Sequence, residues 1–474
     1  MVSTETQVME TVRRWWVLAV VCMAMFMGVL DSTSVYAALP AIARDVGFAP
    51  AEIQWVITAY GVAVGGLLLL GGRLADHMGQ RRVFMAAVAV FAAASLGCGL
   101  AVSSEMLIAA RVLQGVGAAV MTPAGLSILM HVFPEGPERN KALGLWGGLG
   151  GIGASAGLLL GGVLTDWVGW AWIFYTNVPV CVIVVIVCPV LLPRGVRNRR
   201  ALDLPGAITA TGALVLTLLA LFRIAEHGIG PFTLAFGAGA VILTAMFVVI
   251  ERYSPVPLVP LSIFASRTLV GGNLVILVAG VAVDGLLIIV TLYAQQVLGL
   301  SAIQFGLTMA IMTVTSVIAV FAGQHLVTRA GFRRVASGGL VLLAIACVLL
   351  SSLTPDGTVV KNLLAGLLVF GAGMGAAFVA GQIAALTGVA QEHAGLAAGV
   401  EETSFAVGTT VGAALASAIA IGYATRGNVA TPSVAELTEG FGAALLALAA
   451  IAALGAVLAV VLLRHVPQEQ AIRS

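Results

Sequence analysis

Long apolar runs constrain this sequence more than any other feature. Each run holds about 20 mostly apolar residues, which is the length a helix needs to cross the hydrocarbon core of a membrane. We count fourteen runs in the 474 residues, and the breaks between them hold the turn residues and nearly all the charges. The runs begin near Trp15, Gln54, Val83, Met106, Ala142, Ala171, Leu204, Phe232, Thr268, Ala302, Val335, Asn362, Ala394 and Gly440.

The composition excludes a water-soluble fold. Hydrophobic residues make up 60% of the chain and charged residues only 9%, whereas a soluble domain carries roughly 25% charged residues. A lipid bilayer can solvate such a surface, and helices satisfy their own backbone there. The net charge of +2 gives no basic field for nucleic acid. We therefore expect an all-α polytopic membrane protein. Because we find no nucleotide loop, metal set or nucleophile constellation, we expect neither an enzyme nor a bound cofactor.

Arginine and lysine orient the helices, because these residues accumulate on the cytoplasmic side of membrane proteins. With both termini in the cytoplasm, eighteen of the 23 basic residues fall inside and four outside, and Arg111 remains within the membrane. Shifting the count by one helix removes this asymmetry. The distribution therefore favours fourteen helices over thirteen or fifteen.

Two parts of the chain repeat each other. One set of residues recurs at a shift of 252, and Gly115, Gly117, Ala118 and Ala119 recur at a shift of 258 as Gly373, Gly375, Ala376 and Ala377. The first set is Gly71, Leu74, Gly79, Arg81, Arg82 and Val83, with Thr328 at the position of Asp76. We therefore predict a six-helix bundle over residues 1–195, a linker with two extra helices over 196–255, and a second six-helix bundle over 256–474. Two related halves favour a substrate site between them near the bilayer midplane.

Asp31 and Arg111 are charged residues inside predicted membrane helices, where a charge is costly unless it is paired or solvated. A carboxyl group taken out of water can hold a proton near neutral pH, so we interpret Asp31 as a proton carrier, with Ser34 one turn on facing the same wet cavity. Arg111 keeps its proton and would act on Asp31 as a fixed positive charge. The alternatives are a structural polar pair for Asp31 and an arginine bonded to helix carbonyls.

Asp284 lies at a similar depth in the ninth run, and a shift of 252 makes it nearly the repeat mate of Asp31. We expect it to face the same cavity. The alternative is a local kink at Gly285 with Asp284 bonded to backbone.

Glu401 and Glu402 lie about two turns into the thirteenth run. Adjacent helical residues point about 100° apart, so one of them is expected to serve proton coupling or cation binding and the other to reach the interface or a packing partner. We assign the role to neither in particular. Two interfacial acids near a helix N-terminus remain the alternative.

The loop between the second and third runs contains Gly72, Asp76, Gly79, Arg81 and Arg82. Glycine allows a tight turn, and Asp76 can bond arginines or a helix N-terminus across the domain boundary. We interpret the loop as a conformational latch rather than a ligand site.

The fifth run carries small residues at helical spacing, which make a flat face for close, sliding helix contact. They are Gly147, Gly150, Gly151, Ala154, Gly157, Gly161 and Gly162.

Together these segments resemble the major facilitator superfamily, and within it the fourteen-helix drug:proton antiporter branch, along essentially the whole chain. The loop at Asp76 resembles the superfamily's hallmark motif. The segment from Arg111 to Gly117 resembles the helix 4 motif tied to proton coupling, and Gln114 within it is assigned to the substrate site. The fifth run resembles the antiporter motif, with Leu158 where proline is usual.

Three further segments support the same branch. The segment around Asp31 resembles the branch's helix 1 motif, with Tyr36 where asparagine is common, and the segment from Trp170 through Asn177 to Pro179 is similar to a branch signature. Acids like Glu401 and Glu402 occur in some multidrug members, which fits cationic cargo.

The resemblance implies the major facilitator fold, with two helices inserted between two six-helix bundles, and a proton-coupled exporter of drugs, antibiotics or other amphiphilic or cationic molecules. We expect it in the bacterial cytoplasmic membrane, working as a monomer on the proton-motive force, with a substrate site of Asp31, Ser34, Gln114, Asp284 and Glu401. One alternative is an exporter dedicated to one native metabolite or self-made antibiotic. A proton-coupled uptake symporter is disfavoured by the glycine face of the fifth run. A membrane sensor would need a substantial soluble output domain.

Overall fold

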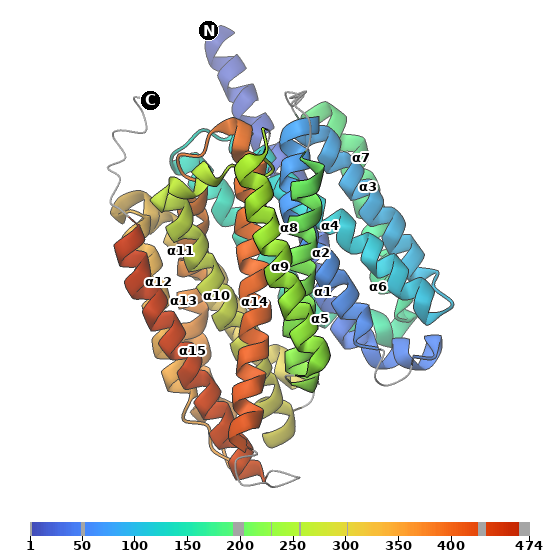
Figure 1. Ribbon diagram of the computed structural model, residues 1–474, viewed down its shortest axis with the longest axis vertical. Helices are drawn as coiled ribbons and strands as arrows, with labels where there is room; N and C mark the ends of the chain where they lie inside the picture. Colours follow the sequence, from blue (N-terminus) through green and yellow to red (C-terminus); the bar gives the residue numbers. More distant parts are fainter. Residues whose placement is uncertain are drawn as a thin grey trace. The chain divides into compact units, whose positions relative to one another are not determined.

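The structure is a computed structural model that describes residues 2–48, 53–192, 203–228, 230–255, 257–300, 302–424 and 433–463. Within these ranges every regular element is a helix (Figure 1). Thirteen segments of the described chain are long and apolar enough to cross a membrane. The helix α5, with 32 residues, stands at the remaining predicted run. The chain is an all-helical polytopic membrane protein.

The predicted runs correspond to helices throughout. The first six lie in α1 (Val2–Val46), α2 (Trp55–Met78), α3 (Gln80–Gly99), α4 (Ser104–Val132), α5 (Pro137–Val168) and the consecutive α6 (Ala171–Tyr175) and α7 (Asn177–Leu191). The inserted pair is α8 (Leu204–His227) and α9 (Pro231–Tyr253). The remainder comprises η1 (Leu261–Ala265), α10 (Arg267–Leu292), η2 (Tyr293–Val297), α11 (Ala302–Ala330), α12 (Phe332–Leu350), η3 (Val359–Leu363), α13 (Leu364–Leu386), η4 (Gln391–His393), α14 (Ala394–Ala424) and α15 (Val434–Leu462).

Several helices begin before their apolar run because polar residues satisfy the free N–H groups of the first turn. α15 begins at Val434 rather than near Gly440. The Ser433 side chain there accepts from the Glu436 backbone N–H, and the Glu436 side chain accepts from the Ser433 backbone N–H. Thr358 similarly accepts from the backbone of Lys361, so η3 precedes the predicted start of α13.

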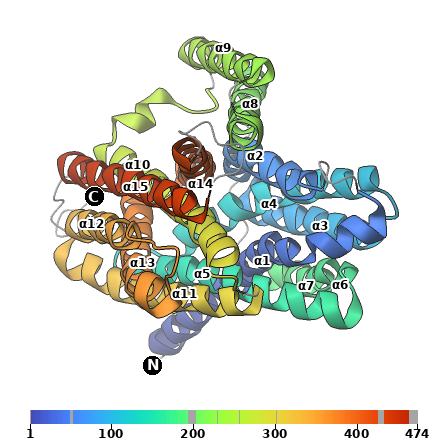
Figure 2. The ribbon, with the colours of Figure 1, turned by 90° about the horizontal axis from the view of Figure 1, so that it is seen from below.

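The chain forms two compact units. Unit 1 comprises Met1–Val215, Met246–Val259 and Val389–Glu402. Within it α4 packs along α2 and α3, α1 packs along α5, and α7 lies against α1 and α3 (Figure 2). Unit 1 therefore holds the helices of the first six runs together with the first part of α8, the last part of α9 and the first residues of α14.

Unit 2 comprises Leu216–Ala245, Pro260–Gly388 and Thr403–Ser474. Within it α13 packs along α11 and α12, while α15 packs along α10 and α12 (Figure 2). The predicted boundaries at 195/196 and 255/256 involve residues outside the described ranges, so the three-part division remains a prediction.

Seven of the arginines used to orient the chain also lie outside the described ranges, so the predicted topology remains a prediction too. They are Arg194, Arg197, Arg199, Arg200, Arg426, Arg464 and Arg473.

The predicted repeat is present at the short turns. Gly79 between α2 and α3 has φ 91°, and Gly331 between α11 and α12 has φ 83°. Both values lie in the left-handed region that favours glycine. Each of these glycines donates its N–H to the carbonyl oxygen four residues earlier, Ala75 in one case and Val327 in the other. The two turns are therefore built alike, at the predicted shift of 252.

The predicted shift of 258 between α4 and α13 is wrong by two residues. A Cβ added to Gly117 would collide with Phe91 on α3, and one added to Gly373 would collide with Leu343 on α12. Phe91 and Leu343 are related by the shift of 252. Gly373 therefore occupies the position of Gly117, at a shift of 256. Repeated glycines made the shift ambiguous in sequence, and the contacts of each glycine with a neighbouring helix decide it.

The prediction that Asp284 is nearly the repeat mate of Asp31 is also wrong. Gly161 on α5 approaches the backbone of Ser34 on α1, and Gly412 on α14 approaches the backbone of Val281 on α10. One turn earlier, Gly157 and Gly408 meet the Leu30 and Leu277 carbonyl oxygens in the same way. Both pairs relate α10 to α1 by a shift of 247.

This shift places Val278, not Asp284, at the position of Asp31. The shift of 247 is five residues smaller than the shift of 252 between the short turns, so unit 2 carries five extra residues between α10 and α11. The π-helical turn η2 lies in that stretch.

Candidate functional site

Asp31 forms the centre of a polar cluster inside unit 1. It lies in the second half of α1, and its side chain is fully buried at 0% exposure. Three side chains donate hydrogen bonds to its carboxylate. Arg111 Nη1 lies 2.7 Å from Oδ2, and Oδ1 accepts from Gln114 Nε2 at 2.9 Å and from Asn177 Nδ2 at 2.6 Å. The carboxylate therefore has a cation and two amides as partners, all supplied by other helices.

Arg111 and Gln114 both come from α4. Because they are three residues apart on a helix, their side chains share one face. Arg111 Nη1 donates to Gln114 Oε1 at 2.7 Å, and Arg111 Nε donates to the Val56 carbonyl oxygen at 2.8 Å. Its guanidinium also lies 4.2 Å from the centroid of the Tyr60 ring, a distance at which a cation is attracted to an aromatic face. Arg111 thus makes both of the contacts considered from the sequence, the pair with Asp31 and a bond to a helix carbonyl.

Ser95 on α3 completes the cluster. Its hydroxyl accepts from Gln114 Nε2 at 2.8 Å and from Asn177 Nδ2 at 3.3 Å, and it donates to the Phe91 carbonyl oxygen at 2.8 Å. The Cys98 thiol donates to Gln114 Oε1 at 3.6 Å. α1, α3, α4 and α7 are therefore joined by one polar network that is closed off from solvent.

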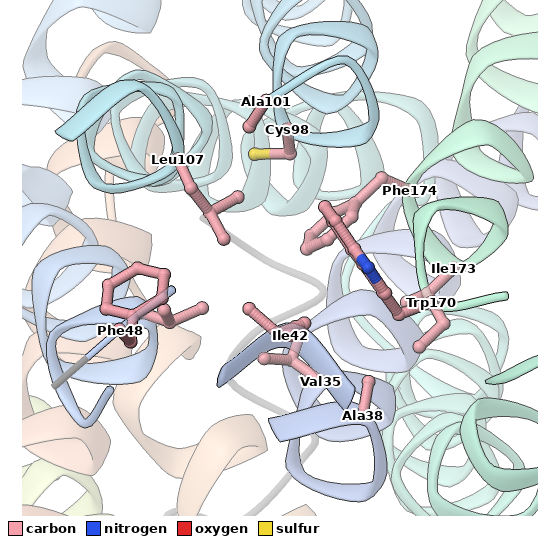
Figure 3. Packing of buried hydrophobic residues seen from close by; sticks show 11 residues of the cluster. Val35, Ala38, Ile42, Phe48, Cys98, Ala101, Leu107, Trp170, Ile173 and Phe174 are labelled. Atoms are coloured by element: carbon pink, nitrogen blue, oxygen red, sulfur yellow. The ribbon is translucent and has the colours of Figure 1, made fainter. Parts of the chain in front are cut away.

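A cluster of buried apolar residues, drawn in Figure 3, adjoins this network through Cys98, which bonds Gln114. Val35 lies one turn after Asp31 and is fully buried, as is Phe174, whose ring centroid lies 5.8 Å from the Arg111 guanidinium. Because the surroundings have a low dielectric, the attraction between Asp31 and Arg111 is stronger than it is in water. The remaining members are Ala38, Ile42, Phe48, Val56, Cys98, Ala101, Leu107, Trp170 and Ile173.

Ser34 is buried one turn from Asp31 but bonds elsewhere. Its hydroxyl donates to the backbone carbonyl of Asp31 at 3.1 Å and not to the carboxylate. The backbone of Ser34 faces Gly161 on α5 so closely that a Cβ at that glycine would overlap it. Ser34 therefore lies at the contact between α1 and α5.

The glycine face of α5 is directed largely at α1. Cβ atoms added at Gly150 and Gly157 would collide with Met25 and with Thr33, whereas one at Gly162 would meet open space. Gly147 lies on the same helix and is half-buried. Small residues thus let α1 and α5 approach closely, with Gly162 outside the contact.

Asp76 caps the N-terminus of α14. The segment predicted as a loop is helical apart from Gly79, and Asp76 lies in the last turn of α2. Its Oδ1 accepts from the Gly395 backbone N–H at 2.8 Å, and its Oδ2 accepts from that of Leu396 at 2.9 Å. A carboxylate is favourable there because the free N–H groups and the helix dipole attract negative charge. Gly72 lies directly against the Gly395 carbonyl. Asp76 therefore bonds a helix N-terminus, one of the two partners predicted for it. That N-terminus groups with Asp76 in unit 1, so this bond does not cross a boundary between the units as predicted.

The arginines on either side of Gly79 differ in their contacts. Arg81 donates to the Pro189 and Leu192 carbonyl oxygens at 3.2 and 3.3 Å, at the C-terminal end of α7, where a cation is favourable. The side chain of Arg82 is exposed. Arg73 donates to the Pro257 carbonyl oxygen at 2.8 Å.

The remaining predicted acids are not members of the Asp31 cluster. Asp284 on α10 is half-buried and makes no hydrogen bond or ion pair with any described residue. Glu401 is 1% exposed, whereas Glu402 beside it is half-buried. In the described part of the chain, no group of three or more His, Cys, Asp or Glu side chains is placed to hold a metal ion.

The structure brings together three residues that the sequence singled out, Asp31, Arg111 and Gln114. Sequence reasoning missed Asn177 and Ser95 as partners of Asp31. Asn177 was detectable as a polar side chain in an apolar run, but nothing in its own segment shows which helix it faces.

Comparisons with known proteins agree with this architecture. A sequence model of the family described as Major Facilitator Superfamily matches residues 21–283 and 272–473. The solved structure of the human organic anion transporter MFSD10 (TETRAN) superposes with a TM-score of 0.69 at 15% identity, and the match covers 94% of this chain and 99% of that one. At this identity the likeness shows the fold alone.

Several bacterial relatives match along most of the chain. The puromycin resistance protein pur8 of Streptomyces alboniger is 37% identical over 466 residues, which are 95% of this chain and 92% of that protein. The cephamycin export protein CmcT of Amycolatopsis lactamdurans is 36% identical over 439 residues, covering 91% and 89%. The lincomycin resistance protein of Streptomyces lincolnensis is 31% identical over 449 residues, covering 92% and 91%.

Proposed function

The chain belongs to the Major Facilitator Superfamily, and from this premise we propose that it exports antibiotics or other drug-like small molecules in exchange for protons. The names of three bacterial relatives, which refer to puromycin resistance, cephamycin export and lincomycin resistance, support the cargo class. The fully buried ion pair between Asp31 and Arg111 carries the proposal of proton exchange.

Asp31 is the proposed proton carrier because it is the one acid in this network and its partner cannot give up a proton. The positive charge of Arg111, 2.7 Å away, stabilises the ionised form of the carboxylate. A movement of α4 relative to α1 that lengthened this contact would favour protonation. Binding and release of the proton would thereby follow the conformation of unit 1.

Transport then proceeds by alternating access, with one half rocking on the other. Cargo enters from the cytoplasm or inner leaflet while the carboxylates are ionised, and protons replace it on the outer side. The membrane potential supplies about 2.3 kcal/mol per charge per 100 mV. Exchange of more than one proton per monovalent cation is therefore driven by the potential.

Asp284, Glu401 and Glu402 are proposed to attract cationic cargo or to carry further protons. An acid within the membrane is costly unless it serves such a role, and Asp284 has no ion-pair partner among the described residues. Transport of one cationic and one neutral drug by Asp284→Asn, Glu401→Gln and Glu402→Gln variants tests this. A role in cargo binding predicts that only the cationic drug is affected.

Two sets of contacts are proposed to support the change of conformation. The cap of Asp76 on α14 would act as the latch, and the close contact of α1 with Gly157 and Gly161 would allow sliding. We propose further that both termini lie in the cytoplasm, that the protein resides in the bacterial cytoplasmic membrane and that it works as a monomer.

Everted membrane vesicles test the proposal. Addition of cargo to energised vesicles is expected to cause proton release, recorded with a pH-sensitive dye, and Asp31→Asn is expected to abolish it. Asp166→Asn is the matched control, because Asp166 is an exposed acid near the end of α5. Unchanged proton release in the Asp31→Asn variant would refute the assignment of Asp31.

A second candidate function is export of one native metabolite. It is favoured by the relatives, since names such as the tetracenomycin C resistance and export protein of Streptomyces glaucescens, which is 32% identical over 407 residues, mention a single compound. A resistance panel of unrelated drugs, measured in cells with and without the protein, separates the two. Resistance to one compound alone would favour the dedicated exporter.

A further inference from the structure

The hydrogen-bond partners of Asp31 suit only its ionised form. Arg111 Nη1, Gln114 Nε2 and Asn177 Nδ2 all donate to its carboxylate. A protonated carboxyl group carries an O–H donor of its own, and a buried donor without an acceptor costs free energy. If Asp31 takes up a proton, one neighbouring group has to change from donor to acceptor.

Two of the nearby acceptors are already in use. Gln114 Oε1 accepts from Arg111 and from the Cys98 thiol. The Ser95 hydroxyl accepts from both amides and donates to the Phe91 carbonyl oxygen. An oxygen of either kind has two lone pairs, so both oxygens are fully engaged.

Asn177 holds an acceptor that is not in use. Its side chain is fully buried, and its Oδ1 accepts no hydrogen bond from any described residue. The same amide donates to Asp31 Oδ1 through Nδ2 at 2.6 Å. Since the two ends of an amide are nearly equal in size, a half turn about the Cβ–Cγ bond exchanges them without a change in packing. The turn exchanges the bonds that Nδ2 donates to Asp31 and Ser95 for one that Oδ1 accepts.

We propose that Asn177 is a positioning residue that reverses its amide when Asp31 binds a proton, so that Oδ1 accepts the new O–H of Asp31. The proposal rests on the proposed role of Asp31 as proton carrier. The proton comes from water on the outer side and leaves to the cytoplasm, and Asn177 itself gains and loses none. In the ionised state Asn177 donates to Asp31, and in the protonated state it accepts from it.

None of the charged or titratable side chains that act on Asp31 accepts a hydrogen bond from it in the described structure. The titratable or charged side chains that act on it are Arg111 from α4, Tyr60 from α2, Cys98 from α3 and Cys181 from α7. A guanidinium has no acceptor atom, and a thiol accepts only weakly. The Tyr60 ring lies under Arg111, and no hydrogen bond joins Tyr60 to Asp31 in the described structure.

Infrared difference spectroscopy of the purified full-length protein in lipid tests the proposal. The asparagine side-chain carbonyls carry an isotope label, and spectra are recorded as the pH is lowered. We expect a carboxylic C=O band that is absent from Asp31→Asn. With it, we expect a shift of the labelled amide carbonyl to lower frequency, because that carbonyl becomes hydrogen-bonded. Asn177→Leu should remove the amide shift, and Asn273→Leu, a change in unit 2, should retain it.

The midpoint of the carboxylic band separates the proposed role from a fixed structural one. If Asn177 only donates to the ionised form, Asn177→Leu raises the midpoint by about one pH unit or more. If Asn177 bonds both the ionised and the protonated form of Asp31, its removal destabilises both forms. The midpoint of the carboxylic band then moves by less than about half a pH unit. If Asn177→Leu does not accumulate in the membrane, Asn177→Ser removes the labelled carbonyl in its place.

The outcomes distinguish the two proposals. Absence of any carboxylic band that depends on Asp31 would overturn the proton-carrier role. Two outcomes would overturn the reversal of Asn177 but keep Asp31 as the proton carrier. One is a carboxylic band that depends on Asp31 and is not accompanied by the amide shift. The other is a midpoint of that band that rises by a full pH unit in Asn177→Leu.

Discussion

The two halves of the chain share their helix contacts and differ in what those contacts enclose. In unit 1, Asp31 on α1 meets Arg111 and Gln114 on α4. In unit 2, the shifts read from the glycine contacts place Val278, Leu367 and Phe370 at the corresponding positions, and all three are buried. One half therefore has a polar interior where the other has an apolar one.

The difference continues through the rest of the cluster. Cys347 stands at the position of Ser95 and is fully buried. Gly455 on α15 faces Val278, much as Asn177 on α7 faces Asp31. None of these residues of unit 2 carries a charge.

Comparison of the two units distinguishes what helix packing requires from what the proposed proton exchange requires. A buried ion pair replaced by well-packed apolar residues of similar volume often leaves stability unchanged or improves it, and unit 2 packs in this way. Stability alone therefore does not account for the pair of Asp31 and Arg111. Its presence in one half supports the proposal that protons are handled mainly there, with the other half as a similarly built partner.

The largest expected effect comes from copying one residue of unit 2 into unit 1. Arg111→Leu removes the cation and leaves the buried carboxylate of Asp31 with amide partners only. Breaking a buried pair in this way costs about 3–5 kcal/mol, so we expect a loss of that size in equilibrium unfolding in detergent, together with loss of cargo-induced proton release.

The double variant Asp31→Val/Arg111→Leu is the matched control. It removes both charges, while Gln114 and Asn177 keep Ser95 as a partner. We expect it to regain more than half of the lost stability and to remain unable to exchange protons. A double variant as unstable as the single one would contradict the view that unit 1 can pack like unit 2.

A smaller effect is expected where the halves are built alike. Gly161→Ala and Gly412→Ala each place a Cβ against backbone atoms of the facing helix. Such overpacking costs about 1–3 kcal/mol, and the two losses, measured by unfolding in detergent, should be similar. Gly162→Ala should cost nothing, since its Cβ would meet open space. Clearly unequal losses would show that the two contacts are not equivalent.

The smallest effect concerns the turn between α2 and α3, where Asp76 of unit 1 stands at the position of Thr328 in unit 2. Asp76→Asn keeps one acceptor oxygen for α14 and loses the other together with the charge. We expect a cost of about 0.5–2 kcal/mol, measured by unfolding, and slower transport. Arg82→Gln in the first turn of α3 should change stability by less than about 0.5 kcal/mol, because substitutions at exposed positions usually have effects of this size. Equal effects of the two substitutions would count against the helix-cap interpretation.

Much of the fold could be predicted because the relevant signals are local. Each run of about 20 apolar residues reports its own preference for lipid, and all fourteen predicted runs lie in helices. Asp31 and Arg111 stood out for the same reason, since a charge inside such a run is costly wherever it points. The start of α15 was missed by a few residues because the cap formed by Ser433 and Glu436 lies outside the apolar run.

The partners of these charges were harder to predict. Asp284 was matched to Asp31 because the shift was taken from the short loops, and the five extra residues between α10 and α11 displaced the match. Asn177 carries no charge, and its proximity to Asp31 depends on how α7 is rotated against α1. The sequence of a helix does not contain that rotation.

By itself the sequence determined that the chain spans a membrane as a bundle of helices and that a few charged side chains lie within it. The transfer of each segment from water to lipid depends on the residues of that segment alone, so the contributions can be read one after another. Only the tertiary structure decided that Asp31 meets Arg111, Gln114 and Asn177, and that unit 2 has no such cluster at the corresponding positions. These side-chain contacts depend on how one helix is rotated and shifted along another. Close contacts between small residues far apart in the chain set that rotation and shift.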